Sequence, residues 1–352
     1  MMTIFEGITA ETVQTPRLRA NVLRRPATDA VRRTVVFVHG NVSSSLFWQP
    51  LMLALPSDID AYAIDLRGFG GSETLPVDAT RGLRDFSDDL HSVVEELGLG
   101  GPDLDVDLVG WSMGAGVVMQ YALDHPARTL TLQAPVSPYG FGGTRGTDGE
   151  RLTPDDAGVG AGGANPDFVA RLETGDTTEE SPTSPRAVYR SAYVAAGFVS
   201  EHEDVWVESM LTTRTGPDNY PGDSVATEPW PGFAAGTRGV LNTMAPQYFD
   251  VSGIVDLPTK PPILWVHGSV DAIVGDASYF DINQLGAAGV IPGWPGADVA
   301  PPSPMVAQTR TVLDAYAAAG GTYHEVLFEG AGHSPHLERP AEFLNALARH
   351  LA

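Results

Sequence analysis

The sequence of 352 residues has no cysteine, a single lysine and no long hydrophobic run. Because cysteine is absent, the chain forms no disulfide, holds no metal through a thiolate and offers no cysteine nucleophile. The apolar runs are shorter than the roughly 20 residues that a membrane-spanning helix requires, so we expect no membrane partner. Residues 1–20 lack a basic segment followed by an apolar one, which indicates a cytoplasmic protein without an export signal.

Positive charge is scarce as well. The chain has 44 acidic residues against 21 basic ones, which gives a formal net charge of -23. Such a charge repels phosphate backbones and anionic lipids, so it argues against nucleic acid as a partner. Hydrophobic residues make up 43% of the chain, which is typical of a soluble globular protein with a substantial core. The composition leaves a homo-oligomer open and identifies no function.

The most informative stretch, residues 110–114, reads Gly-Trp-Ser-Met-Gly and matches the pattern G-x-S-x-G. The apolar residues from Leu104 to Val109 predict a buried strand before it, and residues 117–123 predict a buried helix after it. A serine on so sharp a turn stands above the sheet at the positive end of the helix dipole, and the glycines avoid a steric collision. We therefore predict that Ser112 is a nucleophile; an ordinary glycine-serine turn is the alternative.

Strands and helices alternate on both sides of this stretch. Further strands are predicted over residues 16–22, 34–38, 61–65, 129–132, 262–266 and 323–328, and helices over 46–55, 85–97, 306–319 and 340–351. The alternation predicts an α/β fold with a mostly parallel central sheet and helices on both faces. Catalytic groups in such sheets gather at the carboxyl ends of the strands.

Two segments interrupt the pattern. Residues 136–258, the long insertion, are rich in glycine, proline, threonine and acids, with helical pieces near 166–172, 185–198 and 205–212. Their many aromatic side chains argue against disorder, and a long irregular segment in a compact domain is typical of a lid. We predict a cap over residues 136–258, between two parts of one core at 1–135 and 259–352. Residues 275–305, the short insertion, interrupt the second part.

A serine hydroxyl needs a base to take its proton, and a histidine held by a carboxylate meets that need. His333 follows the last predicted strand in a glycine-rich turn, and Asp271 follows the strand before it. Both should therefore lie at the same edge of the sheet as Ser112. The order serine, aspartate, histidine along the chain is also the one found with a G-x-S-x-G turn, or nucleophile elbow, between a strand and a helix.

Rival residues exist for the base and for the acid. His336 lies in the same turn as His333, but the Gly-x-Gly before His333 favours that position. The strand at 129–132 ends in Gln-Ala-Pro and offers no carboxylate there. Asp250 and Asp256 precede the next strand, so we expect them on the return of the cap instead.

Other residues should support the reaction. The backbone N–H groups of Asn41 and Met113 are predicted to stabilise the oxyanion. We interpret His39 as a structural residue that fixes the loop after the strand at 34–38. A hydrogen-bonded turn, not a catalytic role, is predicted for Asp65, Arg67 and Ser72. Aromatic side chains are expected to line the substrate site, among them Trp111, Trp206 and Trp230.

These motifs together resemble the α/β-hydrolase superfamily. They are His-Gly-Asn at 39–41, Asp-Leu-Arg-Gly at 65–68, the elbow at 110–114, Gly-Ser-Val-Asp at 268–271 and Gly-His at 332–333. The resemblance covers residues 16–135 and 259–352 and implies a capped α/β-hydrolase fold. It also implies a triad of Ser112, His333 and Asp271, an acyl-enzyme intermediate, and neither a cofactor nor a metal. A serine at the elbow implies cleavage of an ester, lactone or amide.

The expected function is hydrolysis of a carboxylic ester or lactone of a small molecule. Residues 136–259 contain 18 acids and 7 arginines, which favours a neutral, mainly apolar substrate. A carboxylate seated by Arg190 or Arg214 is the alternative. The same residues also fit an aminopeptidase or amidase of the proline-iminopeptidase type, a carbon–carbon bond hydrolase or a perhydrolase. A ligand-sensing protein with a vestigial triad is the non-enzymatic alternative.

Overall fold

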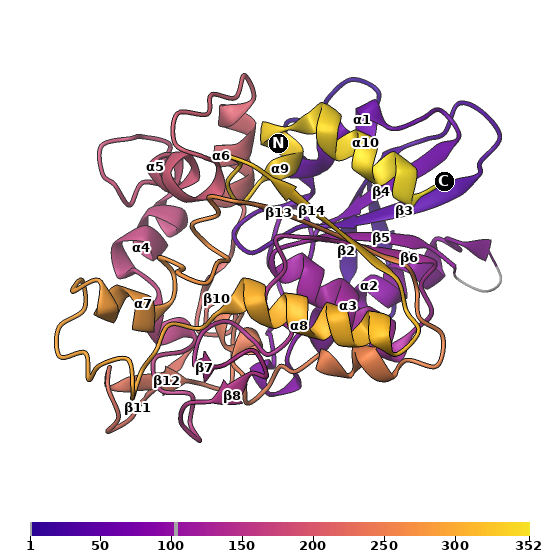
Figure 1. Cartoon of the computed structure of the whole chain (residues 1–352). Coiled ribbons are helices and arrows are strands. Elements are labelled where there is room, and N and C mark those ends of the chain that lie inside the picture. Colours follow the sequence, from indigo (N-terminus) through magenta and orange to yellow (C-terminus); the bar gives the residue numbers. More distant parts are fainter. Residues whose placement is uncertain (1, 102–104) are drawn as a thin grey trace.

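The structure is a computed structural model that describes residues 2–101 and 105–352. Leu104, included in the strand predicted before Ser112, lies outside the described residues. A central sheet of eight strands has the order β1-β2-β4-β3-β5-β6-β13-β14 (Figure 1). The pairs β1-β2 and β2-β4 are antiparallel, and the other neighbours in this sheet are parallel. The strands are β1 (Thr9–Gln14), β2 (Arg19–Arg25), β3 (Arg33–Val38), β4 (Ile59–Ile64), β5 (Asp107–Trp111), β6 (Thr129–Gln133), β13 (Ile263–Gly268) and β14 (Tyr323–Phe328).

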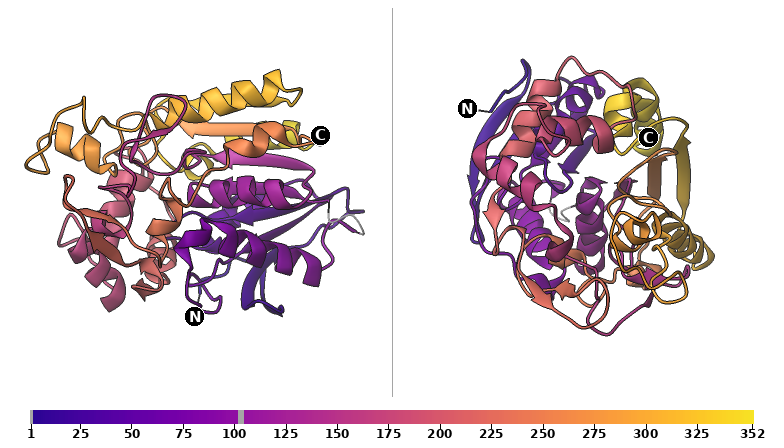
Figure 2. Two further views of the ribbon diagram at one scale, coloured as in Figure 1. Left: turned by 90° about the horizontal axis from the view of Figure 1, so that it is seen from below. Right: turned by 90° about the vertical axis from the view of Figure 1, so that its left-hand side faces the viewer.

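Helices cover both faces of this sheet, as Figures 1 and 2 show. One face carries α1 (Gln49–Ala54) and α10 (Pro340–His350), and the other carries α2 (Arg84–Glu96), α3 (Met113–Asp124) and α8 (Met305–Ala318). The predicted α/β fold with a mostly parallel sheet is therefore confirmed. Within residues 2–101 and 105–352, no helix has both the length and the apolar character needed to cross a membrane.

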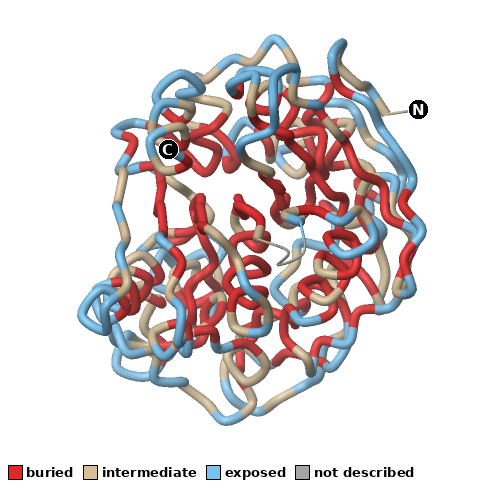
Figure 3. The backbone as a smooth tube through the Cα atoms, turned by 90° about the vertical axis from the view of Figure 1, so that its right-hand side faces the viewer, coloured by how far each residue is buried: buried red, intermediate tan, exposed pale blue. Residues whose placement is uncertain are grey.

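The core lies between the sheet and these helices. Every residue of β4, β5, β6 and β13 is buried. Strands covered on both faces are mostly apolar, which made β13 recognisable as an apolar run. β6 is an exception, because its sequence Thr-Leu-Thr-Leu-Gln alternates although every residue is buried. Figure 3 shows the buried segments in the middle of the molecule and the exposed ones along its outer loops.

The first strand of the sheet has no counterpart among the predicted strands. β1 lies at the edge of the sheet, and Val13 is its one buried residue. Such a strand has neither a continuous apolar run nor a regular alternation. β2 covers Arg19–Arg25 and so begins and ends three residues later than the strand predicted over 16–22.

Most of both insertions lies beyond the same end of the sheet (Figures 1 and 2), whereas residues 252–256 of the long insertion pack against α3 and α8. The long insertion follows β6, and the short insertion follows β13, so both begin where a parallel strand ends. Their helices are α4 (Pro166–Thr174), α5 (Pro185–Val188), α6 (Glu203–Leu211) and, in the short insertion, α7 (Ile282–Ala287); α9 (Pro335–Glu338) precedes α10. Three small sheets pair β7 (Thr144–Arg145) with β8 (Glu150–Arg151), β9 (Thr215–Gly216) with β10 (Tyr220–Pro221), and β11 (Ser224–Ala226) with β12 (Phe233–Ala235). Short helical turns are η1 (Ser45–Trp48), η2 (Ala79–Arg81), η4 (Ala161–Gly163), the π-helical η5 (Tyr189–Tyr193), η6 (Leu241–Met244) and η7 (Ser252–Asp256).

Candidate functional site

Ser112 occupies the turn between β5 and α3 with φ +57° and ψ -119°. A residue with a side chain rarely adopts such a backbone conformation, and it persists only where the surroundings enforce it. The glycines beside it are required by close packing. A Cβ at Gly110 would lie 2.4 Å from the carbonyl oxygen of Gly114, and a Cβ at Gly114 would lie 2.3 Å from that of His39. The turn therefore forms in this sequence because both positions are glycine.

His333 and Asp271 are joined by a hydrogen bond at the ends of β14 and β13. The distance from His333 Nδ1 to Asp271 Oδ2 is 2.8 Å, and both side chains are about 2% exposed. A carboxylate only accepts hydrogen bonds, so Nδ1 is the donor, and in the neutral form of the imidazole the lone pair is on Nε2. The other carboxylate oxygen, Oδ1, accepts the N–H groups of Ile273 (2.8 Å) and Val274 (3.0 Å). Asp271 is thus fixed on both sides and holds the imidazole in one tautomer.

Ser112 and His333 line one cavity of about 490 Å³. The walls come from the core and from both insertions, and most of the side chains are apolar. The large apolar side chains of the wall include Phe141, Phe168, Leu241, Met244, Ile282 and Leu285. The volume falls within the range of about 300–1,000 Å³ that is usual for small-molecule sites. The arrangement can therefore enclose a small organic molecule against a serine and the imidazole of His333.

The two N–H groups predicted to stabilise an oxyanion also belong to residues of the cavity wall. Met113 is the first residue of α3, so its N–H has no partner within the helix. The peptide that carries the N–H of Asn41 is fixed through the carbonyl oxygen of Gly40. That oxygen accepts hydrogen bonds from His39 Nδ1 at 2.7 Å and Ser43 Oγ at 2.8 Å. Because a trans peptide directs its C=O and N–H to opposite sides, the orientation of the Asn41 N–H follows.

His39 and His336 are core residues. His39 Nε2 accepts the N–H of Leu66 at 3.0 Å, and burial lowers the pKa of the imidazole. His39 therefore fixes its loop, as predicted. Burial lowers the pKa of His336 to about 3, its Nδ1 lies 2.7 Å from Gln133 Nε2, and its ring packs 4.6 Å from that of Trp48. His336 is not among the residues described as lining the cavity.

The two other acidic candidates lie apart from His333. Asp250 is exposed, and its carboxylate accepts the N–H and the hydroxyl of Ser252. Asp256 ends η7, before β13 begins. Neither is among the described residues that line the cavity.

The expectation for the three tryptophans is corrected, because none of them is among the described residues of the cavity wall. Trp111 is buried beneath the site and donates from Nε1 to the carbonyl oxygen of His333 at 2.9 Å. Trp206 is buried against Phe47, with 5.0 Å between ring centroids. Trp230 donates from Nε1 to the carbonyl oxygen of Pro292 at 2.9 Å and so joins the two insertions. Large indoles are the side chains that gain most from complete packing, and composition does not tell which way they face.

Asp281, which was not among the residues predicted for the site, lies in the cavity wall at the start of α7. It is buried, and its carboxylate accepts the N–H groups of Asn283 (2.9 Å) and Ser303 (2.8 Å). Burial raises the pKa of Asp281 to about 6, although the two hydrogen bonds act in the opposite direction. It is the one carboxylate among the described residues of the wall. Its position before a short helix is the only trace of it in the sequence.

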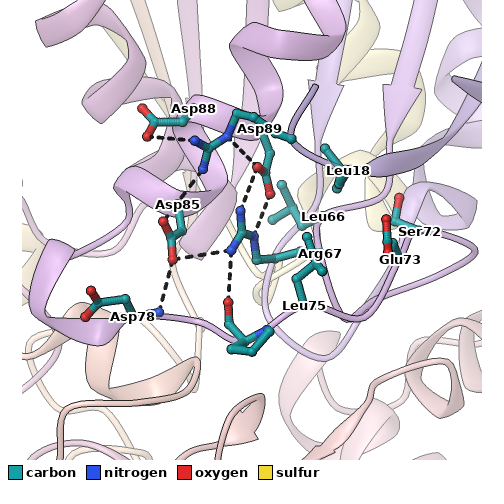
Figure 4. Close-up of polar contacts among 12 residues, drawn as sticks. Leu18, Leu66, Arg67, Ser72, Glu73, Leu75, Asp78, Asp85, Asp88 and Asp89 are labelled. Carbon is teal, nitrogen blue, oxygen red and sulfur yellow. Dashed lines mark hydrogen bonds and ion pairs between the residues drawn. The ribbon is translucent and has the colours of Figure 1, made fainter. Parts of the chain in front are cut away.

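The polar residues at 65–72 form the hydrogen-bonded turn that the sequence predicts. The hydroxyl of Ser72 donates to the carbonyl oxygen of Asp65 at 2.6 Å. The guanidinium of Arg67 binds both carboxylate oxygens of Asp89, at 2.6 and 2.7 Å, and lies 3.4 Å from Asp85 (Figure 4). These contacts anchor the loop after β4 to α2. In the part of the chain that the structure describes, no group of three or more His, Cys, Asp or Glu residues is arranged to hold a metal ion.

Comparisons with known proteins agree on the fold. A model described as "Alpha/beta hydrolase family" matches residues 35–346. No curated protein matches the sequence significantly. An esterase from Exiguobacterium antarcticum superposes with a TM-score of 0.59 at 15% identity, over 97% of this chain and 99% of that chain. A carboxylesterase from Bacillus subtilis superposes with a TM-score of 0.59 at 16% identity, over 98% of this chain and 92% of that chain. A bromoperoxidase from Bacillus anthracis superposes with a TM-score of 0.59 at 18% identity, over 97% of this chain and 99% of that chain. At such identities the likeness concerns the fold alone.

Proposed function

The chain belongs to the alpha/beta hydrolase family, and on that premise we propose that it is a serine hydrolase acting on carboxylic esters or lactones. The observation that carries the proposal is the hydrogen-bonded pair of Asp271 and His333, which shares a cavity with the strained Ser112. A strained serine, a histidine of fixed tautomer and a buried carboxylate are the parts that nucleophilic acyl transfer requires.

The reaction follows from these positions. His333 Nε2 takes the proton of Ser112 Oγ while the oxygen attacks the carbonyl carbon of the substrate. The N–H groups of Asn41 and Met113 stabilise the oxyanion, and Asp271 stabilises the imidazolium. His333 then gives the proton to the leaving oxygen, which releases the alcohol or opens the lactone. Water, deprotonated by the same histidine, attacks the acyl-enzyme and frees Ser112.

The substrate is proposed to be neutral and mainly apolar. Each methylene buried against an apolar wall is worth about 0.8 kcal/mol. Among the described residues of the wall there is no lysine or arginine, so a carboxylate would find no cationic partner there. Arg190, one of the two arginines considered for that role, is held by Glu179 and Glu203. Arg214, the other, is exposed and is likewise not among the described wall residues.

We further propose that the two insertions act as a cap. Residues from both of them line the cavity together with Ser112, and this supports the proposal. A cap would exclude bulk water during acyl transfer and would select substrates by size. Its selectivity would depend on apolar wall residues and not on the three tryptophans.

The test is a substrate panel of p-nitrophenyl esters, lactones and aminoacyl-anilides, with Ser112→Ala as the matched control. We expect multiple turnover of neutral esters or lactones by the wild type and none above background by the variant. A preference for the anilides would identify an amidase, and activity that depends on peroxide would identify a perhydrolase. Stoichiometric binding without turnover would contradict the proposal and favour a sensor.

A further inference from the structure

We propose that Tyr193, a residue of the long insertion, is a positioning residue of the oxyanion hole; the inference rests on the proposed function. Its hydroxyl lies 3.0 Å from the carbonyl oxygen of Asn41 and 3.1 Å from that of Val42. The phenol has one hydrogen to donate, so the two carbonyls of the loop share it. The side chain is buried and lines the cavity beside Ser112 and His333.

The loop needs to be held because its backbone is strained. Val42 has φ +46°, a conformation that is unfavourable for a β-branched side chain. Such a conformation persists only when surrounding contacts enforce it. The hydroxyl of Tyr193 contacts the peptide groups on both sides of Val42, which places the restraint at the strained residue.

Tyr193 also completes the restraint of Asn41. The peptide before Asn41 is fixed through the carbonyl oxygen of Gly40 by His39 and Ser43. The peptide after Asn41 is fixed through its own carbonyl oxygen by Tyr193. With both flanking peptide planes restrained, the N–H of Asn41 keeps one direction. Stabilisation of an oxyanion depends on such preorganised donors, because their orientation costs nothing during the reaction.

The segment that carries Tyr193 is itself fastened to the histidine loop. The N–H of Ala195 donates to Glu338 Oε2 at 2.8 Å, and the same carboxylate accepts the N–H of Gly332 at 2.9 Å from Oε1. A Cβ at Gly332 would lie 2.7 Å from the backbone nitrogen of Ala195, so the two backbones are in direct contact. Residues 193–195 therefore link the loop of Asn41 and Val42 to the loop of His333. At this point the long insertion is hydrogen-bonded to the loop of Asn41 and contacts the loop of His333.

The inference is tested by comparing the variants Tyr193→Phe and Tyr189→Phe. Tyr189 lies in the same helical turn and is buried, and its hydroxyl has no hydrogen-bond partner in the part of the chain that the structure describes. We expect Tyr193→Phe to lower kcat by about tenfold with little change in KM, which is less than the 10²–10³-fold loss of a whole oxyanion donor. Binding of a trifluoromethyl ketone, which forms an oxyanion on Ser112, should weaken by a similar factor. Binding of an ether of the same size as the ketone, which forms no oxyanion, should not change. Tyr189→Phe should behave as the wild type in all of these measurements.

A second pair of variants keeps the test valid if the phenylalanine variant does not fold. p-Aminophenylalanine at position 193 keeps an N–H donor near the position of the hydroxyl, whereas p-methylphenylalanine fills the same space without a donor. We expect the amino variant to retain most of kcat and the methyl variant to lose about as much as Tyr193→Phe. Equal loss in both would overturn the inference, as would equal weakening of ketone and ether binding.

The rate at which a fluorophosphonate labels Ser112 separates this inference from the proposed function. Slower labelling of Tyr193→Phe than of Tyr189→Phe supports the inference whichever acyl substrate the protein uses. Equal labelling of the two variants and the wild type overturns the inference alone. No labelling of the wild type overturns the proposed function, and the inference with it.

Discussion

Replacing Asp271 with asparagine should invert the tautomer of His333. The carboxylate accepts three hydrogen bonds, from His333 Nδ1 and from the N–H groups of Ile273 and Val274. An amide has one accepting oxygen and one donating nitrogen. If the amide nitrogen faced the two backbone N–H groups, three donors would meet in a buried place, and leaving them unsatisfied is costly. The amide oxygen will therefore stay with Ile273 and Val274, and the NH₂ group will face His333.

The histidine must then accept at Nδ1 and carry its proton on Nε2, where it cannot take a proton from Ser112. Loss of the correct tautomer in a serine triad costs about 10⁴-fold in kcat, which corresponds to about 5 kcal/mol of transition-state stabilisation. The assay is kcat/KM on the best neutral ester, with circular dichroism to verify the fold. Asp250→Asn is the matched control, because Asp250 is exposed and caps only its own turn. More than a tenth of wild-type activity in Asp271→Asn, or loss of activity in Asp250→Asn, would refute the reasoning.

Three further predictions follow from the same geometry. Ser112→Ala should lower kcat for ester hydrolysis by at least about 10³-fold with the fold intact, and His333→Ala should abolish activity. If a fluorophosphonate labelled another serine, Ser112 would not be the nucleophile. Because the pKa of Asp281 is raised to about 6, its carboxyl is neutral below that pH and charged above it. The kcat/KM ratio of a neutral ester to its carboxylate analogue should therefore rise with pH through about 6 in the wild type, and a flat ratio would be evidence against the role of Asp281 in the wall. The same ratio should fall as salt screens the acidic insertions. A preference for the anionic substrate at low salt would contradict the argument that the acidic residues of the insertions repel anions.

The fold was predictable where burial produces a recognisable pattern of apolar residues along the sequence. β3, β5 and β13 are continuous apolar runs because both faces of the sheet are covered, and β14 has the predicted bounds 323–328. The turn of Ser112 was predictable because glycines on both sides of a serine between a strand and a helix form a local sequence pattern. The contact that requires Gly114, with the carbonyl oxygen of His39, comes from a loop far earlier in the chain. The proximity of Asp271 and His333 was predictable because parallel strands end at one edge of a sheet.

The walls of the site were not predictable in the same way. Tyr193 contacts a loop about 150 residues earlier in the chain, and Asp281 binds an N–H group more than 20 residues later. Neither contact leaves a periodic pattern in the sequence. The error over the tryptophans has the same origin, because composition shows that an indole is present but not whether it faces a cavity or the core. β1 was missed because only Val13 of that edge strand is buried.

Because the two insertions contact each other, we expect a change in one of them to require a change in the other. Trp230 of the long insertion donates to Pro292 of the short one, and a Cβ at Gly286 would lie 2.7 Å from its ring. A graft that replaces residues 275–305 alone would remove the cover of this indole and leave an apolar surface in water. A related protein that lacks the short insertion should carry a smaller or more polar residue in place of Trp230. Libraries built to change substrate range should therefore vary the two segments together.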